Sequence, residues 1–202
     1  ASTVSSRGVY KFSVERRSMA TYDAHQSSSH DVEHRGWSNL PEDDWIWHDD
    51  YSWGIGEFVW TGFDYLGEPT PYYTDWPSHS SLFGIVDLAG FEKDIYYMYR
   101  SEWTEKTTLH LFPHWNWQEG TKIDVRAYYN NADEVELFLN NESLGKSTKS
   151  DERLYALWED IEFVAGEITA VSYKNGEEVM RHSRKTAMEP KKLKLIVDRN
   201  IL

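Results

Sequence analysis

The 202-residue chain contains no cysteine, which excludes disulfides, thiol catalysis and thiolate metal sites. It has no hydrophobic run that approaches the ~18 residues of a membrane-spanning helix, so we expect no membrane partner. Basic residues are also scarce, with 21 Lys and Arg against 34 Asp and Glu and a net charge of −13. Because phosphate contacts need an excess of basic side chains, this composition argues against a nucleic-acid partner.

Aromatic residues are abundant by contrast. The chain has ten Trp, 13 Tyr and eight Phe, and nine of the ten Trp lie at or before Trp117. Such clusters form either packed cores or flat platforms on which sugar rings stack. The sequence starts at Ala1 without an initiator Met or a signal-peptide pattern, which we interpret as the mark of a piece cut from a longer protein.

Charge and composition change near Trp103. Residues 1–103 hold seven basic and 17 acidic side chains, a net charge of −10, whereas the remainder has a net charge of −3. In the first part the patterns predict a helix over residues 41–51, a buried strand over 57–63 and a helix over 92–103. This order is typical of an α/β protein with parallel strands. One strand cannot form a sheet, so this part is expected to be incomplete.

The second part, residues 104–188, reads as six or seven short strands. Residues 122–129 alternate with a period of two, as a half-buried strand does. Asn140-Asn141 and Asn175-Gly176 are predicted hairpin turns, the second being the strongest short hairpin signal. We therefore predict an immunoglobulin-type β-sandwich held by packing alone, because it has no cysteine pair. The basic end, residues 189–202, is interpreted as a linker toward a further domain.

Five segments resemble the C-terminal part of a β-galactosidase of glycoside hydrolase family 2. The matching motifs are TVSSRGVY at 3–10, GEFVWTGFDYLGEPTP at 56–71, SSLFGIVDLAGF at 80–91, LFPHWNW at 111–117 and DEVELFLN at 133–140. Together they span nearly the whole chain, and motifs of this length are specific.

The resemblance implies the end of a (β/α)₈ barrel in residues 1–103, followed by the immunoglobulin-like sandwich. Residues 56–65 would be the eighth barrel strand and 92–103 the eighth helix. The seventh helix would be 41–51, preceded by the long loop 1–37. A complete barrel needs about 250 residues, which explains the incomplete first part. Without the other strands, the face around Phe58, Trp60 and Phe63 is expected to be open to water.

The resemblance also implies a retaining glycosidase that acts through two glutamates about 5–5.5 Å apart. In the family these lie on barrel strands four and seven, and the nucleophile, in a Ser-Glu-Thr motif, would lie just upstream of Ala1. We therefore expect no catalytic carboxylate in this chain, and neither a cofactor nor a metal. The expected partners are a carbohydrate and the remainder of the parent polypeptide.

Trp60 is the leading candidate for substrate binding, because the family places a Trp here as the floor of the sugar subsite. The alternative is a core residue of the barrel. Asp64 and Glu68 follow the C-terminal end of the predicted strand, where barrel active sites are built. They would accept hydrogen bonds from sugar hydroxyls or else cap the loop. Glu57 precedes the core of the predicted strand and is expected to be structural.

His25 is a weaker candidate for substrate contact, in a loop rich in His and acidic residues. We interpret this loop as solvated or sugar-lining and not as a zinc site, because it shows no helical pattern. Trp115 and Trp117 would either bind carbohydrate or pack the second domain against the barrel. Packing is the preferred interpretation, because both follow the domain junction closely.

The sequence alone does not decide the substrate sugar or the cellular compartment. Galactose, glucuronate and mannose all occur as substrates in the family, and export from the cell is one option for its members. No basic residue near Trp60 in the sequence would pair with a glucuronate carboxylate, which favours a neutral sugar. A non-catalytic carbohydrate-binding or interaction module is the alternative function.

Overall fold

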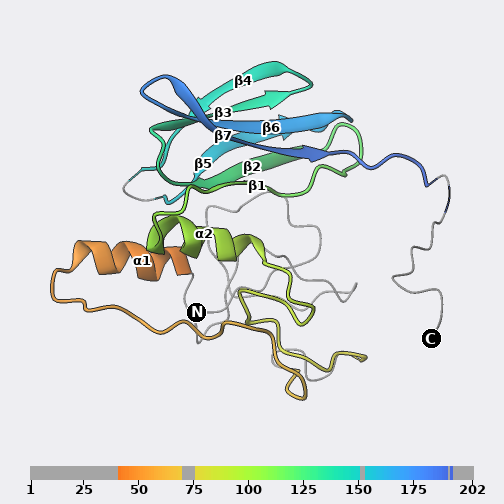
Figure 1. The fold of residues 1–202 in the computed structure, drawn as a ribbon. Helices are drawn as coiled ribbons and strands as arrows, with labels where there is room; N and C mark the ends of the chain where they lie inside the picture. The colour runs from red at the N-terminus through yellow and green to blue at the C-terminus, as the bar shows by residue number, and fades with distance from the viewer. Residues whose placement is uncertain (1–40, 70–75, 151–152, 191, 193–202) are drawn as a thin grey trace, which may run out of the picture.

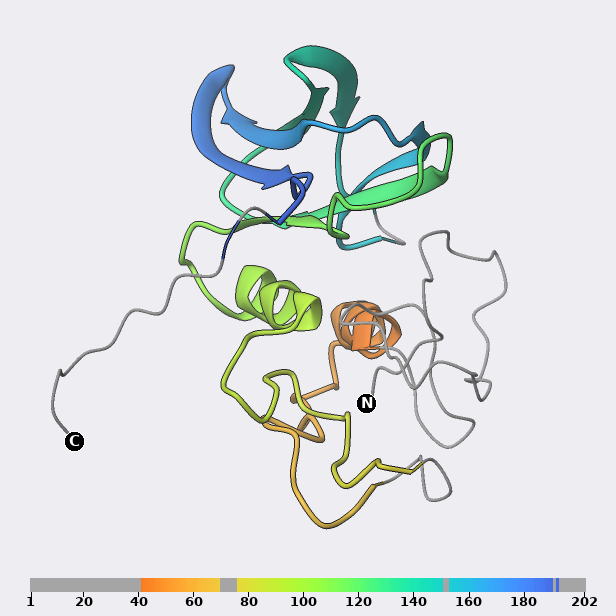
Figure 2. The same cartoon turned by 90° about the vertical axis from the view of Figure 1, so that its right-hand side faces the viewer.

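The computed structural model describes residues 41–69, 76–150, 153–190 and 192. A β-sandwich forms the upper part of the molecule in Figure 1, and two helices with long irregular loops lie below it. The helices, α1 (Pro41–Asp50) and α2 (Asp94–Trp103), lie side by side beneath the sandwich in both views (Figures 1 and 2). Their positions confirm the two predicted helices. Within the described ranges, neither helix is long and apolar enough to cross a membrane.

Seven antiparallel strands build two sheets, which confirms the predicted number. The strands are β1 (Leu109–Phe112), β2 (Lys122–Tyr129), β3 (Glu134–Leu139), β4 (Glu142–Ser147), β5 (Ala156–Glu162), β6 (Glu167–Lys174) and β7 (Glu177–Lys185). One sheet has the order β1-β2-β5 and the other β4-β3-β6-β7. Each sheet therefore pairs strands that are separated in the sequence by a strand of the other sheet, so the sandwich closes only when the whole segment folds.

Both predicted hairpin turns are present. Asn140 and Asn141 join β3 to β4 with φ angles of 51° and 71°, and Asn175 and Gly176 join β6 to β7 with 52° and 82°. Two consecutive residues with positive φ match the right-handed twist of the paired strands, and Asn and Gly tolerate this conformation best. The turn residues thus set the register of both hairpins.

The core of the sandwich is formed by alternate residues of the facing strands. Its fully buried members include Leu111, Ile123, Val125, Ala127, Val135, Leu137, Ile168 and Ala170. These side chains recur with a period of two in β2, β3 and β6, so one face of each strand is apolar. The sheets are held together by this packing.

The prediction that β2 is only half-buried is wrong. Seven of its eight residues are buried, because its second face is covered by α2 (Figure 2). On that face Tyr128 stacks on Phe112, and the Arg126 guanidinium lies 4.2 Å from the Tyr155 ring centre. The second face therefore belongs to a smaller core shared between the three-stranded sheet and the helices.

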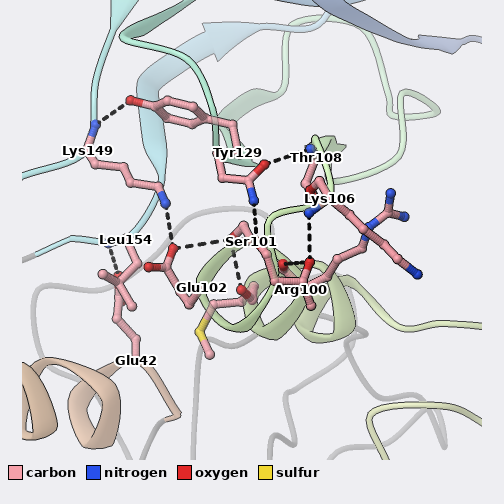
Figure 3. Close-up of polar contacts among 12 residues, drawn as sticks. Glu42, Arg100, Ser101, Glu102, Lys106, Thr108, Tyr129, Lys149 and Leu154 are labelled. Atoms are coloured by element: carbon pink, nitrogen blue, oxygen red, sulfur yellow. Dashed lines mark hydrogen bonds and ion pairs between the residues drawn. The ribbon is translucent and has the colours of Figure 1, made fainter.

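Polar contacts attach both ends of α2 to the sandwich. At its start, an Asp94 Oδ1 lies 2.6 Å from His110 Nε2 of β1. At its end, the Lys149 ammonium pairs with the Glu102 carboxylate (Figure 3). These two contacts fix the helix along its length against the three-stranded sheet.

Helix α1 is attached to the same assembly. The buried Glu42 carboxylate accepts a hydrogen bond of 2.7 Å from the Leu154 backbone N–H (Figure 3). Trp45 and Trp103 bring the two helices together, with ring centres 5.6 Å apart. Charged groups on both helices thus find partners in the sandwich.

The predicted buried strand at 57–63 is not formed. The segment makes an isolated parallel bridge from Phe63 to Val86, and Phe58, Trp60 and Phe63 are exposed. A strand becomes buried only when other elements cover its faces, and no described element covers these side chains. The expectation that this face is open to water is confirmed.

The prediction that Trp115 packs the second domain against the first is also wrong. Trp115 is 1% exposed, lies in the sandwich core and donates from Nε1 to the Val164 carbonyl at 3.0 Å. Trp117 is partly buried against the same core and stacks on His114. The chain turns after β1, and this turn directs Trp115 between the sheets.

Candidate functional site

The candidate site is built on two loops that are bonded to each other along their length. We call residues 59–69 the first loop and residues 79–93 the second loop. The backbone hydrogen bonds join Thr61, Gly62 and Asp64 of the first loop to Phe83, Ile85 and Val86 of the second. Further along, Ser81 N–H donates to the Tyr65 carbonyl at 2.9 Å. The first loop is therefore held in one conformation although it lies outside a regular sheet.

Asp64 is buried between the loops, and both of its carboxylate oxygens have partners within the chain. Oδ1 accepts from the Gly84 N–H at 2.7 Å and from Lys93 Nζ at 3.0 Å, and Oδ2 lies 2.9 Å from the same nitrogen. The side chain is 3% exposed. Of the two interpretations of Asp64, these contacts favour the one in which it supports the loop.

Gly84 allows the two backbones to approach closely. A Cβ at this position would lie 2.1 Å from the Asp64 nitrogen and 2.4 Å from the Phe63 carbonyl carbon. Ordinary contacts between non-bonded heavy atoms are about 3.5–4.0 Å. The position therefore requires glycine for space, and the close approach brings the Gly84 N–H to the Asp64 carboxylate.

Lys93 is the cation of this cluster. Besides Asp64, its ammonium donates to the Leu82 carbonyl at 3.1 Å. Burial lowers the pKa of the Lys93 ammonium, and the hydrogen bond and charge of Asp64 oppose that shift. Lys93 is also the N-cap residue of α2, where the helix dipole disfavours a positive charge. A lysine in this place therefore depends on its carboxylate partner.

Trp60 stands on the first loop beside these anchors. Its side chain is 65% exposed, its Nε1–H points to the Tyr65 hydroxyl at 3.4 Å, and the two rings meet edge to face. The Tyr65 N–H in turn donates to Ser81 Oγ at 3.1 Å. The peptide bond between Trp60 and Thr61 is cis. An exposed indole fixed at one edge can offer its flat face to an apolar or sugar surface.

The other candidates are more dispersed. Glu68 is exposed at the end of the first loop, where the neighbouring Gly67 N–H bonds to the His79 carbonyl at 2.9 Å. Glu57 is half-buried just before the first loop. His25 lies outside the described residues. The structure thus places Trp60, Asp64 and Glu68 on one loop and directs Asp64 into its support.

The described residues contain no group of three or more His, Asp or Glu side chains placed to hold a metal ion. Sequence reasoning missed three residues of the site, namely Tyr65, Gly84 and Lys93. The signal for Lys93 was a cation at the predicted start of a helix, which is electrostatically unfavourable without a partner. Gly84 lay within a recognised motif but carried no local pattern that reveals the close approach.

A family model described as a domain of unknown function, DUF4982, matches residues 120–180, within the sandwich. "Beta-galactosidase BoGH2A" of Bacteroides ovatus is 48% identical over 175 residues, which are 87% of this chain and 20% of that protein. A "putative beta-glucuronidase" of Formosa agariphila is 44% identical over 72% of this chain and 14% of its own length. The chain thus spans about a fifth or less of these relatives.

The comparison with solved structures gives the same result as the comparison of sequences. A "beta-glycosidase from Bacteroides vulgatus" matches with a TM-score of 0.71 and 36% identity, over 85% of this chain and 21% of that one. A glycosyl hydrolase family 2 member from Bacteroides cellulosilyticus matches with a TM-score of 0.64 and 31% identity, over 78% and 25%. By sequence and by fold the chain belongs among the family 2 glycoside hydrolases that its motifs resemble.

Proposed function

We propose that this chain is part of a retaining family 2 glycosidase that hydrolyses terminal β-galactosides. In this proposal it supplies one wall of the sugar-binding cleft and an accessory β-sandwich. The two catalytic glutamates lie on parts of the parent polypeptide outside this chain. The observation that carries the proposal is Trp60, an exposed indole that contacts the Tyr65 hydroxyl and is followed by residues bonded to the second loop.

Trp60 has the features of a sugar platform. A pyranose ring presents an apolar C–H face that packs on an indole without competing hydrogen bonds. The Tyr65 hydroxyl holds the indole edge, so little side-chain freedom is lost when a sugar binds. Glu68, exposed on the same loop, is our proposed acceptor for a sugar hydroxyl. Asp64 would act on the sugar through the loop, and His25 remains a proposed contact.

The exposed apolar side chains near Trp60 support a larger parent enzyme. The first part of the chain exposes Trp53, Ile55, Phe58, Phe63, Leu66 and Phe91. Apolar patches of this kind mark interfaces in soluble proteins. We propose that the remainder of a (β/α)₈ barrel covers them, with 56–65 as its eighth strand, α2 as its eighth helix and α1 as its seventh. Residues 1–103 would form this portion.

We propose that the sandwich is of the immunoglobulin type, and its strand order supports this. Strands β1, β2 and β5 form one sheet and β4, β3, β6 and β7 the other, with crossing connections between the sheets. Such connections are typical of the Greek-key arrangement of that fold. We take residues 104–188 as this domain and 189–202 as a linker beyond it. Because the sandwich packs against α2, the proposed eighth helix, it can support the wall of the barrel.

A neutral sugar is preferred over a glucuronide. Recognition of a glucuronate carboxylate needs a free cation, and Lys93 is the cation that the described part of the chain places at the first loop. Its ammonium is already bound by Asp64 and the Leu82 carbonyl, and the Lys93 side chain is 13% exposed. The relatives named β-glucuronidases keep a glucuronide as the alternative substrate.

The alternative function, a carbohydrate-binding module, depended on Trp115 and Trp117 as sugar-binding residues of the sandwich. Trp115 was a candidate for a sugar site on the sandwich, and it is instead buried in the core. The partly buried Trp117 stacks on His114, which occupies one face of its indole. The enzyme proposal therefore explains more of the aromatic residues.

Kinetics on the full-length protein test the proposal. We expect hydrolysis of a nitrophenyl β-galactoside with a higher kcat/KM than of the β-glucuronide. Trp60→Ala should lower kcat/KM at least tenfold, which corresponds to about 1.4 kcal/mol, whereas Trp60→Phe keeps an aromatic face and should lose less. A preference for the glucuronide would overturn the sugar assignment, and equal activity of Trp60→Ala and wild type would overturn the platform.

The position of the catalytic glutamates is tested on residues 1–202 alone. A folded sample, checked by circular dichroism, should show no turnover of the chromogenic galactoside. Turnover that disappears in Glu68→Gln or Asp64→Asn would mean that the chain carries its own catalytic carboxylates. The proposed strand assignment would then be wrong.

A further inference from the structure

Lys93 makes more contacts than an ordinary lysine at a helix start. Its ammonium has three donors, and three acceptor atoms surround it: both carboxylate oxygens of Asp64, at 3.0 and 2.9 Å, and the Leu82 carbonyl at 3.1 Å. The two charged side chains are 13% and 3% exposed. The pair is therefore largely removed from water and its geometry is defined on every side.

The placement is electrostatically costly, which calls for a role. Burial disfavours the charged lysine, and the N-terminus of α2 adds the positive end of a helix dipole. Buried ion pairs often add little net stability, but loss of one partner leaves an uncompensated charge. A role for this pair is therefore to be sought in the geometry of the segments that it joins.

The pair joins the two loops to the start of α2 at the base of the candidate site. Asp64 belongs to the first loop and Leu82 to the second loop, and Lys93 is the last residue of the second loop and the N-cap of α2. The Lys93 N–H also donates to the Ile85 carbonyl at 3.0 Å. Its neighbour Asp94 contacts His110 of β1, so this helix end is also attached to the sandwich. The ammonium thus connects the first loop to the rigid part of the molecule.

Two contacts hold Trp60, one next to its backbone and one at its ring. The following residue, Thr61, bonds to the second loop through its N–H and its carbonyl. Tyr65, which follows Asp64, contacts the indole nitrogen through its hydroxyl. We propose that Lys93 is a positioning residue of the sugar site, which sets the orientation of the Trp60 indole through Asp64. This proposal rests on the proposed function, because it assigns the indole to sugar binding.

Lys149 provides a matched control. It also forms an ion pair with α2, at Glu102, and its side chain is 25% exposed (Figure 3). Glu102 is nine residues beyond Lys93, or about 13 Å along the helix. Lys93→Met and Lys149→Met therefore each remove an ammonium from an ion pair at one end of α2, and only the pair at the start of the helix holds the first loop.

The test is a double-mutant cycle in the full-length enzyme with a nitrophenyl β-galactoside. Lys93→Met should lower kcat/KM at least tenfold, mainly through a higher KM, and Lys149→Met less than threefold. In a Trp60→Ala background, Lys93→Met should change kcat/KM less than threefold, because the group it positions is gone. Equal losses in the two lysine variants, or an undiminished effect of Lys93→Met in that background, would overturn the proposal.

Two further measurements separate the possible failures. If Lys93→Met does not fold, Asp64→Asn with Lys93→Met removes both charges, and the same kinetic outcomes apply. If the wild-type enzyme cleaves no β-glycoside, the proposed function fails, but hydrogen exchange still tests the link. The Thr61 and Ile85 amides should then exchange at least tenfold faster in Lys93→Met than in wild type. Unchanged exchange would overturn the positioning role.

Discussion

Replacement of Gly84 by Ala should open the junction between the two loops. The added Cβ would lie 2.1 Å from the Asp64 nitrogen, 2.4 Å from the Phe63 carbonyl carbon and 2.5 Å from the Val86 oxygen. All three are backbone atoms, so no side chain can move aside. The loops must therefore separate by about 1.5 Å to restore ordinary contact distances.

The cost follows from the contacts that this separation breaks. Overpacking alone costs about 1–3 kcal/mol. The hydrogen bond from Gly84 to the Asp64 carboxylate and the one from Asp64 to Val86 would be lost as well, at about 1–2 kcal/mol each. We expect the free energy of local opening to fall by about 3–7 kcal/mol, which is more than a hundredfold in exchange rate.

Hydrogen exchange at the Asp64 and Val86 amides measures this opening directly. Gly62→Ala is the matched control, because a Cβ there meets no atom within 4 Å and the change lies in the same loop. We expect Gly62→Ala to exchange within about threefold of wild type. The reasoning would be refuted by equal protection of the two amides in Gly84→Ala and wild type, since the close approach of the backbones would then be wrong.

Three further predictions concern the sandwich. His182 accepts the Leu111 N–H at Nδ1, and burial lowers the pKa of His182 from 6.5 to about 4. The unfolded chain therefore binds this proton first, so the stability contributed by neutral His182 is present above pH 6.5 and is lost as pH falls toward 4. Allowing for solvent screening, about 1 kcal/mol should disappear from urea unfolding between pH 7.5 and 4.5, and His182→Gln should flatten this dependence. Trp115→Ala should cost about 3–5 kcal/mol in the same assay, clearly more than Trp117→Ala, because only the first indole is fully buried. Gly176→Ala should cost about 1 kcal/mol, because its φ of 82° is unfavourable for a residue with a Cβ; an unchanged unfolding midpoint would contradict the turn geometry.

Most of the sandwich could be predicted from local pattern. The period-two alternation of β2 and β3 and the Asn-Gly turn before β7 are properties of adjacent residues, and they led to the right strands and hairpins. The burial of the second face of β2 could not be predicted in this way, because it depends on α2, which is distant in the sequence. The position of Trp115 depended likewise on how the chain turns after β1.

In the candidate site, too, the features that lie in contiguous residues could be predicted and the contacts between distant residues could not. Trp60 was found through its motif, since the aromatic stretch around it is long and specific. Lys93 was missed, because its partner Asp64 is 29 residues earlier and the pair exists only after the two loops meet. The sequence also predicted a buried strand at 57–63, since its aromatic and β-branched residues favour one, but burial requires neighbours that the described chain does not supply.

The sequence by itself determined the family, the two helices, the alternating strands of the sandwich such as β2, and the hairpin turns, because each depends on contiguous residues through motif, periodicity or turn chemistry. Tertiary structure alone decided which carboxylate supports the loop and which faces solvent. It also decided that Gly84 must lack a side chain and that the Lys93 ammonium is enclosed by the two loops. These properties arise from atoms brought together across many residues, where distance and burial, and not residue type, set the energy.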